Sequence, residues 1–361
     1  LEANRGRWVP YARNMARMLR ARRIEMPVVC TPDGQAVNGI GRLQLAAELR
    51  QEAVPVVWIS PQEAALSNAM LNLLSMDFDL HNRYADLLRY NSFRRARRVR
   101  DYLGRGFVFA VIGREAGREF DIREPASLAR WKAVHGSSVL DFGAGHLHET
   151  ELLRSVGIHV TPFEPFRVPA GGAEIDRAAS IDLAVAFLAA VADGHQWSSV
   201  FISSVLNSVP FAEDRAHIAC ICAALCGPRT KLYAVASSVR QAGHRQIRGA
   251  GFLNETHHTA AIFALDYEPG IQLGDFQEKP KVQKYHTQAE FYGLFKPFFN
   301  RVQVTEATNN VQAVCAEPRP VDPERLMAAL RFEFNLPYPD GSRMGLVDQA
   351  VAAFRARGIP L

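Results

Sequence analysis

Between residues 138 and 318 the chain alternates short apolar runs with helical patterns. The run SSVLDF, which ends at Phe142, is almost continuously apolar, as is typical of a strand buried on both faces. Strand–helix alternation of this kind predicts a parallel α/β sheet. The predicted strands cover residues 138–142, 158–164, 198–204 and 230–238, followed by a hairpin at 300–318. The predicted helices cover residues 146–157, 181–194, 217–227 and 287–299.

The residues on either side of this region follow other patterns. Apolar runs at 26–31, 35–40 and 54–60 surround a helical stretch at 41–51, which predicts a compact α+β unit. We therefore expect a first domain, a basic helical linker, an α/β domain whose residues 241–287 form an insertion, and a helical tail. Their expected ranges are 1–75, 76–125, 126–318 and 319–361.

Composition adds little to this picture. The hydrophobic fraction is 48%, the charged fraction is 22% and the net charge is +5, with arginine concentrated before residue 130. No apolar run reaches the roughly 20 residues that span a bilayer, so no membrane insertion is expected. The five cysteines are odd in number and scattered, which favours a reducing compartment and a cytoplasmic location. Three of them lie in HIACICAALCG, which is interpreted as an apolar helix, and no metal site is predicted.

The turn after the first strand of the α/β region carries the candidate chemistry. Gly143 and Gly145 allow a sharp turn and the close approach of a ligand, and the next helix points its N-terminus toward it. Glu164 follows Gly145 by 19 residues, about where a carboxylate holds a ribose in nucleotide-binding folds. The third glycine of a dinucleotide fingerprint is replaced by His148. This pattern favours a cofactor that has a ribose but no pyrophosphate.

With Asp141 before the glycines, the stretch resembles motif I of class I S-adenosylmethionine-dependent methyltransferases. The resemblance covers about residues 126–318. It implies a Rossmann-like, seven-stranded sheet that closes with an antiparallel hairpin, and S-adenosylmethionine as the cofactor. It also implies a set of cofactor-binding residues, namely Asp141, Gly143, Ala144, Gly145, Glu164 and Ser204.

The methyl acceptor is less well defined. Asn207 to Phe211 read NSVPF, which is similar to the Asn-Pro-Pro-aromatic box of DNA amino-methyltransferases but one residue longer. In this interpretation Asn207 orients the acceptor and Phe211 stacks on a flipped base. The alternative is a turn at the strand end with a helix cap. Basic residues and aromatics interleave in the insertion, which suits a nucleic acid or a solvated hairpin equally well.

The first domain resembles the ParB-like N-terminal domain over about residues 5–75. The resemblance rests on Gly39, Arg42, an Ala-Ala pair at 46–47 and Val-Pro-Val at 54–56. It implies contacts of the glycine–arginine turn with nucleotide phosphates, as at other helix starts. NGIGR replaces the usual box with two adjacent arginines, which weighs against nucleotide hydrolysis and nuclease activity and leaves a recognition or scaffold role as the alternative. Phe93–Arg100, which reads FRRARRVR, is either a solvated helix face or a phosphate-facing surface.

Together these features predict a methyltransferase that acts on nucleic acid, with DNA favoured, as in DNA modification. Two alternatives stay open. One is a methyltransferase for a small molecule or protein, and the other is a non-catalytic DNA- or nucleotide-binding protein with an inert methyltransferase fold.

Overall fold

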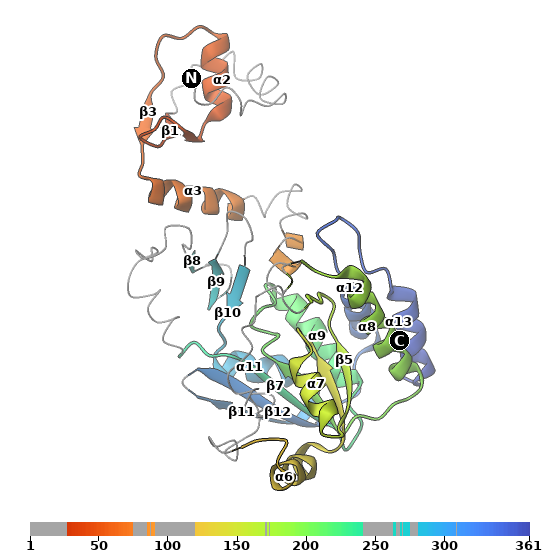
Figure 1. Ribbon diagram of the computed structural model, residues 1–361. Coiled ribbons are helices and arrows are strands. Elements are labelled where there is room, and N and C mark those ends of the chain that lie inside the picture. The colour runs from red at the N-terminus through yellow and green to blue at the C-terminus, as the bar shows by residue number, and fades with distance from the viewer. Residues whose placement is uncertain are drawn as a thin grey trace. The chain divides into compact units, whose positions relative to one another are not determined.

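The computed structural model describes two compact units of this chain (Figure 1). The first unit comprises residues 1–84, 253–261 and 275–278, and the second comprises the remaining residues. None of the helices in the described residues is long and apolar enough to cross a membrane. The described residues are 27–74, 85–86, 88–90, 120–169, 172, 174–240, 263–264, 268, 270–274, 281–307 and 309–361.

The first unit has a small three-stranded sheet with the order β2-β1-β3. Strand β1 pairs antiparallel with β2 and parallel with β3. Ser60 and Glu63 form reciprocal backbone–side-chain hydrogen bonds of 2.7 and 3.2 Å, a capping box that starts α3. The three predicted strands and the helix between them are confirmed, whereas no finding identifies the unit as ParB-like. Its elements are β1 (Val28–Cys30), β2 (Ala36–Asn38), α2 (Ile40–Glu48), β3 (Val56–Trp58) and α3 (Pro61–Leu74).

The second unit is built on a mixed sheet with the order β11-β12-β7-β6-β4-β5. Strands β5, β4, β6 and β7 are mutually parallel, and the closing hairpin of β11 and β12 is antiparallel. The α/β class and the closing hairpin are therefore confirmed. The strands are β4 (Ser138–Phe142), β5 (His159–Phe163), β6 (Ser199–Ser203), β7 (Lys231–Ser237), β11 (Phe299–Glu306) and β12 (Asn310–Pro318).

The prediction of seven strands is not confirmed, because the described residues form a sheet of six. The connection after β5 contains Pro165, Pro169 and two adjacent glycines before it enters α8 (Arg177–Ala192). Proline lacks the N–H that a ladder needs, and this stretch has no apolar alternation. A single helix then returns the chain directly to β6, so β5 stays at the edge of the sheet.

Helices cover both faces of the sheet. Helices α6 (Pro125–His135) and α7 (His148–Ser155) pack on the smaller core, which contains Trp131, Leu153 and Phe201. The larger core lies on the other face under α8, α9 (Ala212–Ala224) and α11 (Gln288–Phe295). The buried strands are thus apolar on both sides, as the continuous apolar runs predict.

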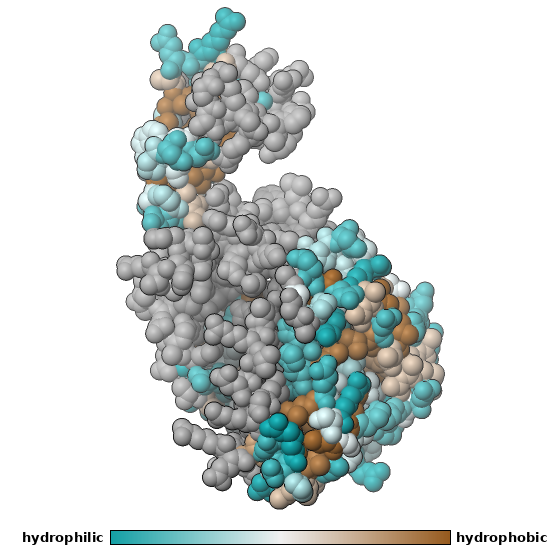
Figure 2. Space-filling model, in the orientation of Figure 1, coloured by the Kyte–Doolittle hydropathy of each residue, from teal (hydrophilic) through white to brown (hydrophobic). Residues whose placement is uncertain are grey.

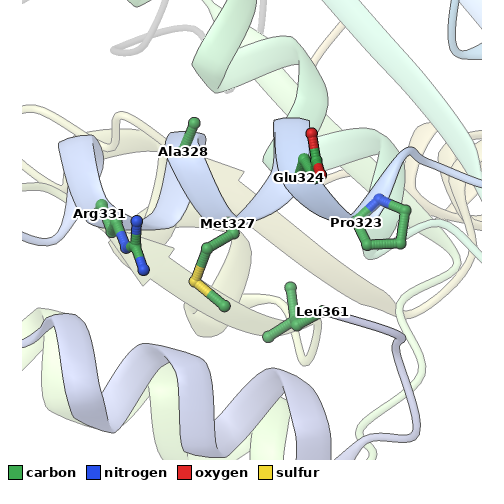
Figure 3. A pocket seen from close by; sticks show the side chains of 6 residues that line it. All are labelled: Pro323, Glu324, Met327, Ala328, Arg331 and Leu361. Carbon is green, nitrogen blue, oxygen red and sulfur yellow. The ribbon is translucent and has the colours of Figure 1, made fainter.

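The C-terminal residues complete the larger core. Helix α12 (Pro323–Glu333) packs on α9, and α13 (Val347–Ala356) packs on α8. Apolar side chains lie among hydrophilic ones on the surface of this region (Figure 2). A hollow of about 410 Å³ lies beside α12, and none of its lining residues belongs to the loops that follow β4, β5 or β6 (Figure 3). Its lining residues are Pro323, Glu324, Met327, Ala328, Arg331 and Leu361.

The predicted insertion contributes a second small sheet with the order β10-β9-β8. Its strands are β8 (Phe263–Ala264), β9 (Ile271–Gly274) and β10 (Lys281–Lys284). The chain then runs through residues 284–286, which we call the crossing segment, between the loop after β6 and the end of β7. The Lys284 N–H donates to the Asn207 carbonyl at 2.8 Å, and the His286 N–H donates to the Ser237 carbonyl at 2.8 Å.

Candidate functional site

The loop after β4 turns in the way that its glycines predict. Gly143 has a φ of 85°, a conformation that side chains rarely adopt. Its N–H and that of Ala144 both donate to the Phe163 carbonyl, at 2.7 and 3.0 Å. A Cβ atom on Gly143 would lie 2.3 Å from the Val205 Cγ2 atom. The loop after β4 therefore packs directly against the loop after β6, and only glycine fits between them.

Asp141 is buried at the end of β4, with 3% of its surface exposed. Its Oδ2 atom accepts a hydrogen bond of 2.9 Å from the Thr150 hydroxyl on α7. This contact holds the carboxylate beneath the glycine loop. The start of α7 also carries Leu147 in a left-handed conformation, with a φ of 62°.

Glu164 closes the same loop from the end of β5. Its Oε2 atom accepts a 2.6 Å hydrogen bond from the Gly145 N–H, and its Oε1 atom accepts one of 2.9 Å from the Phe166 N–H. An ionised carboxylate has about four acceptor positions, so one position per oxygen is left for a ligand hydroxyl. The spacing of 19 residues predicted that Glu164 lies near the glycines, and this hydrogen bond joins them.

The loop after β6 contains the other predicted residues. Ser204 has a φ of 59°, and its N–H donates to the Val235 carbonyl at 2.9 Å. Asn207 is buried, with 8% exposure, and its Nδ2 atom lies 3.5 Å from the Ser208 hydroxyl. The N-cap of α9 is Phe211, without a side-chain capping bond, so Asn207 does not cap this helix.

Phe211 lies on the helical side of this loop. The Arg89 guanidinium is 4.8 Å from the Phe211 ring centroid and 5.0 Å from that of Phe332. Arg89 also donates to the Asp214 carboxylate at 2.9 Å, and burial raises the pKa of that carboxyl while Arg89 opposes the shift. The Arg89 cation therefore lies over one face of the ring that was predicted to stack on a base.

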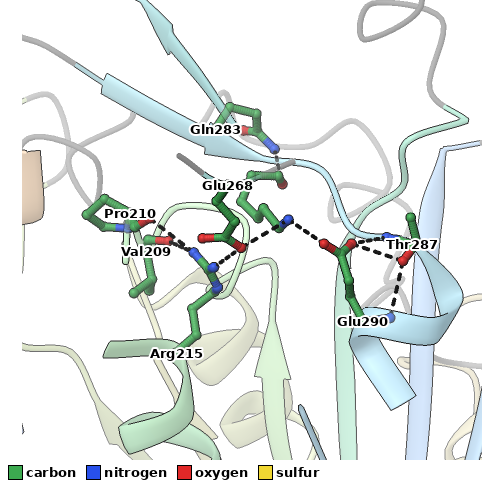
Figure 4. A network of polar contacts seen from close by, with 8 residues as sticks. Val209, Pro210, Arg215, Glu268, Gln283, Thr287 and Glu290 are labelled. Atoms are coloured by element: carbon green, nitrogen blue, oxygen red, sulfur yellow. Dashed lines mark hydrogen bonds and ion pairs between the residues drawn. The ribbon is translucent and has the colours of Figure 1, made fainter. Parts of the chain in front are cut away.

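A buried polar network joins the insertion to this loop (Figure 4). The Arg215 guanidinium donates to the Val209 and Pro210 carbonyls, at 2.8 and 3.1 Å, and pairs with Glu268. The Lys284 ammonium, which is 1% exposed, lies 3.0 Å from the Glu268 carboxylate.

The same ammonium lies 2.9 Å from the Glu290 carboxylate, whose other oxygen accepts from the Thr287 N–H and hydroxyl. Two cations and two carboxylates thus alternate, and their charges cancel. The network fixes residues 209–210 through their carbonyl groups.

His286 belongs to this site and was not singled out in the sequence beyond its place in the basic insertion. It is 3% exposed, packs edge-on against Phe291 and forms an isolated bridge with Ser238. Burial first, and then the charges of Arg215 and Lys284, lower the pKa of His286 well below its ordinary value. Its imidazole is therefore neutral at pH 7.

The remaining predicted residues do not belong to the loops after β4, β5 and β6. In the first unit, the Arg42 guanidinium donates to the Pro27 carbonyl at 3.0 Å, beside Gly39 with its φ of 93°. The described residues contain no group of three metal-ligating side chains. Phe93–Arg100 and most of the insertion's basic residues lie outside the described residues.

The cysteines are buried within the second unit or the small sheet of the first. Burial raises the pKa of Cys220 to about 11 and that of Cys226 further still. Thiols whose pKa is raised in this way are inert at neutral pH, so no thiolate chemistry is expected from them. Helix α9 covers most of HIACICAALCG, which confirms the helix interpretation of this stretch.

No protein-family model and no curated protein matches this chain. Solved structures with a similar arrangement include the CcbJ methyltransferase from Streptomyces caelestis, which is 17% identical over 56% of this chain and 92% of its own, with a TM-score of 0.34. The PH0226 protein from Pyrococcus horikoshii is 12% identical over 56% and 93%, with a TM-score of 0.36. A methyltransferase from Bacteroides fragilis, in complex with S-adenosyl-L-homocysteine, is 13% identical over 55% and 80%, with a TM-score of 0.29. At these identities and TM-scores the similarities do not assign the chain to a family.

Proposed function

We propose that the second unit is an S-adenosylmethionine-dependent methyltransferase that acts on nucleic acid, with DNA favoured. The observation that carries this proposal is the hydrogen bond of 2.6 Å from the Gly145 N–H to the Glu164 carboxylate. It joins the glycine loop of β4 to the acidic end of β5, and Asp141 lies buried beneath that loop.

The order of the strands supports a ligand site at the carboxyl ends of β4, β5 and β6. From β4 the chain passes to β5 on one side, and it then returns to β6 on the other side of β4. The loops after β4 and β6 therefore leave the sheet in opposite directions, and ligands of open α/β sheets bind in the crevice at such a switch point. The closing antiparallel hairpin agrees with the resemblance to class I methyltransferases.

The residues at this edge fit S-adenosylmethionine. Glu164 keeps one acceptor position on each oxygen for the two ribose hydroxyls, and the half-buried Gly145 has no side chain to cover the loop backbone. His148, in place of a third glycine, disfavours a pyrophosphate. When bound, the cofactor supplies an electrophilic methyl group. Asp141 and Glu164 would hold and orient it, and the loop after β6 would face the acceptor.

The proposal of a nucleic-acid acceptor has separate support. The chain has 42 lysine and arginine residues against 37 acidic ones, with arginine dense before residue 130. A basic region attracts phosphates regardless of base sequence. For the first unit we propose nucleic-acid or nucleotide binding, and for the whole chain a cytoplasmic location.

The first test is calorimetric titration of the full chain with S-adenosylhomocysteine. We expect micromolar binding that weakens about 10- to 100-fold in Glu164→Gln and in Asp141→Asn, because each loses a charge-assisted contact worth about 1.5–3 kcal/mol. Glu151→Gln, which changes an exposed carboxylate on α7, is the matched control and should bind like the unmodified chain. A folded chain that does not bind would refute the cofactor proposal.

A second test addresses the acceptor. Transfer of tritiated methyl groups from S-adenosylmethionine to unmethylated genomic DNA is expected, and at limiting cofactor it should fall about 10- to 100-fold in Glu164→Gln. Cofactor binding without transfer to DNA or RNA would favour a small-molecule or protein acceptor. Binding of DNA without binding of the cofactor would instead favour an inert methyltransferase fold.

A further inference from the structure

Three buried polar atoms near the end of β6 have no hydrogen-bond partner among the described residues. They are the Ser203 hydroxyl, the Asn207 Oδ1 atom and the His286 Nε2 atom. Their residues are 6%, 8% and 3% exposed. A buried polar atom without a partner costs about 1–3 kcal/mol, so native proteins retain few of them, and each calls for an explanation.

Backbone pairing brings these three residues to the same edge of the sheet. Ser203 ends β6 and pairs with Val235 of β7. Two residues further along β7, Ser237 accepts from the His286 N–H at 2.8 Å. The crossing segment also donates to Asn207, through the Lys284 N–H at 2.8 Å. The strand end, its exit loop and the crossing segment are therefore tied together where the proposed function expects the methyl acceptor.

The hydrogen bond made by one ring nitrogen of His286 determines whether the other nitrogen, Nε2, is a donor or an acceptor. A backbone hydrogen bond with Leu206 opposes the lowering of the pKa of His286, as a bond that the ring donates to a carbonyl does, so the bonded nitrogen carries the proton. Since Nε2 is the nitrogen without a partner, Nδ1 is the donor and Nε2 presents a lone pair. Asn207 Oδ1 is likewise an acceptor. The edge thus offers two free acceptors and one hydroxyl, and a ligand here must donate hydrogen bonds.

The charges around this edge disfavour an ionic ligand. The ammonium of Lys284 and the guanidinium of Arg215 are both paired within the network of Figure 4, which is neutral as a whole. A phosphate would find acceptors where it needs donors. An alkylammonium would have no lone pair to methylate and no unpaired carboxylate in this network to balance its charge.

We infer that Ser203, Asn207 and His286 receive an uncharged amino group, as on an aromatic or heteroaromatic ring, which is the methyl acceptor. This inference rests on the proposed function. An amino group has two N–H donors, which satisfy Asn207 Oδ1 and His286 Nε2 together and leave the nitrogen lone pair free. A hydroxyl group has a single proton and would leave one acceptor unpaired.

The transfer step balances with these groups. The nitrogen lone pair forms the bond to the methyl carbon while the carbon–sulfur bond breaks, and its electron pair stays on sulfur as the thioether of S-adenosylhomocysteine. The methylated nitrogen is then cationic and passes one proton to His286 Nε2, which releases it to water with the product. In this scheme His286 first accepts a hydrogen bond that selects and orients the amino group, and after the transfer it accepts the proton.

The test needs no knowledge of the natural acceptor. Sinefungin is an S-adenosylmethionine analogue in which a carbon that bears an amino group replaces the sulfur that bears the methyl group. Its amino group is protonated at pH 7, so it keeps the positive charge of the sulfonium within the cofactor site, and its N–H donors reach toward the acceptor site. We expect the full chain to bind sinefungin at least about tenfold tighter than S-adenosylhomocysteine, which corresponds to one additional good hydrogen bond. In Asn207→Leu and His286→Phe this preference should disappear, whereas the affinity for S-adenosylhomocysteine should stay within about threefold.

Gln283→Met is the matched control for Asn207→Leu. Gln283 is also a buried amide beside the crossing segment, but its Nε2 atom already donates to the Ser237 hydroxyl at 2.9 Å. This variant should keep the preference for sinefungin. Equal affinities for the two ligands, or a preference that survives in both Asn207→Leu and His286→Phe, would overturn the inference and leave the proposed function intact. If a folded chain bound neither ligand, the proposed function itself would fail.

Discussion

Glu333, the last residue of α12, gives the sharpest test of the packing around the site. It is 2% exposed and has no cationic partner among the described residues. Burial first, and then the carboxylates of Asp214 and Glu164, raise the pKa of Glu333 from 4.5 to about 8. In the folded protein this carboxyl group is therefore protonated at neutral pH.

The sign of the effect on stability follows from linkage. Below pH 4.5 the group is protonated in both the folded and the unfolded chain, so it costs nothing. Between pH 4.5 and about 8 only the unfolded chain ionises, and the free energy of unfolding falls by about 1.4 kcal/mol per pH unit. The loss is about 3 kcal/mol at pH 7 and levels off near 5 kcal/mol above pH 8.

The perturbation is Glu333→Gln, which keeps the shape and removes the titration. Urea unfolding is followed between pH 5 and 9 by the fluorescence of the buried Trp131 and Trp197, in a background with the other two tryptophans replaced by phenylalanine. The variant should become more stable than its parent as the pH rises, by about 3 kcal/mol at pH 7. Glu324→Gln, an exposed carboxylate on the same helix, should change stability by less than about 0.5 kcal/mol throughout. A difference between Glu333→Gln and its parent that does not grow with pH would refute the reasoning.

Three further perturbations test the loops and the network. Gly143→Ala should cost at least about 2 kcal/mol in urea unfolding, because its φ is 85° and the new Cβ meets Val205; adding Val205→Ala should recover only the part due to the clash. Ser199→Ala should lower the melting temperature by several degrees, because the Ser199 hydroxyl donates to the His135 carbonyl at 2.7 Å. Ser203→Ala should leave the melting temperature nearly unchanged, because the Ser203 hydroxyl has no partner among the described residues. Lys284→Met should cost about 3 kcal/mol in urea unfolding by leaving two carboxylates without their ammonium, and an equal loss in the exposed Lys231→Met would contradict this account.

The elements that follow local rules could be predicted from the sequence. Continuous apolar runs mark β4 and β6 because both faces of these strands are covered by helices. The glycine loop and Glu164 could be paired because the spacing of a strand–turn–helix–strand unit is nearly constant. In each of these cases a property of consecutive residues, or a standard separation along the chain, carries the information.

The number of strands and the polar network could not be predicted in this way. The six-stranded sheet depends on a connection after β5 whose described residues contain no strand, which a general resemblance does not reveal. The contact of Arg215 with Glu268 joins residues 53 positions apart, across a segment without regular spacing. Contacts of this kind also decide the state of His286. The composition of the insertion suggests a solvent-exposed basic side chain, whereas the structure shows a buried, neutral imidazole.

The contribution of the C-terminal residues to the core could not be predicted from the sequence either, and here the physical cause is clearer. Helix α12 looks polar in the sequence because it buries one stripe only, which includes Leu326, Ala329 and Leu330. Beyond it, the Phe334 ring lies 5.6 Å from that of Phe163, the residue before Glu164. Strand β5 is the edge of the sheet, and its last residue, Phe163, is packed by this ring directly before the carboxylate that accepts from the glycine loop. The cofactor site we propose therefore rests in part on packing by residues that follow the closing hairpin.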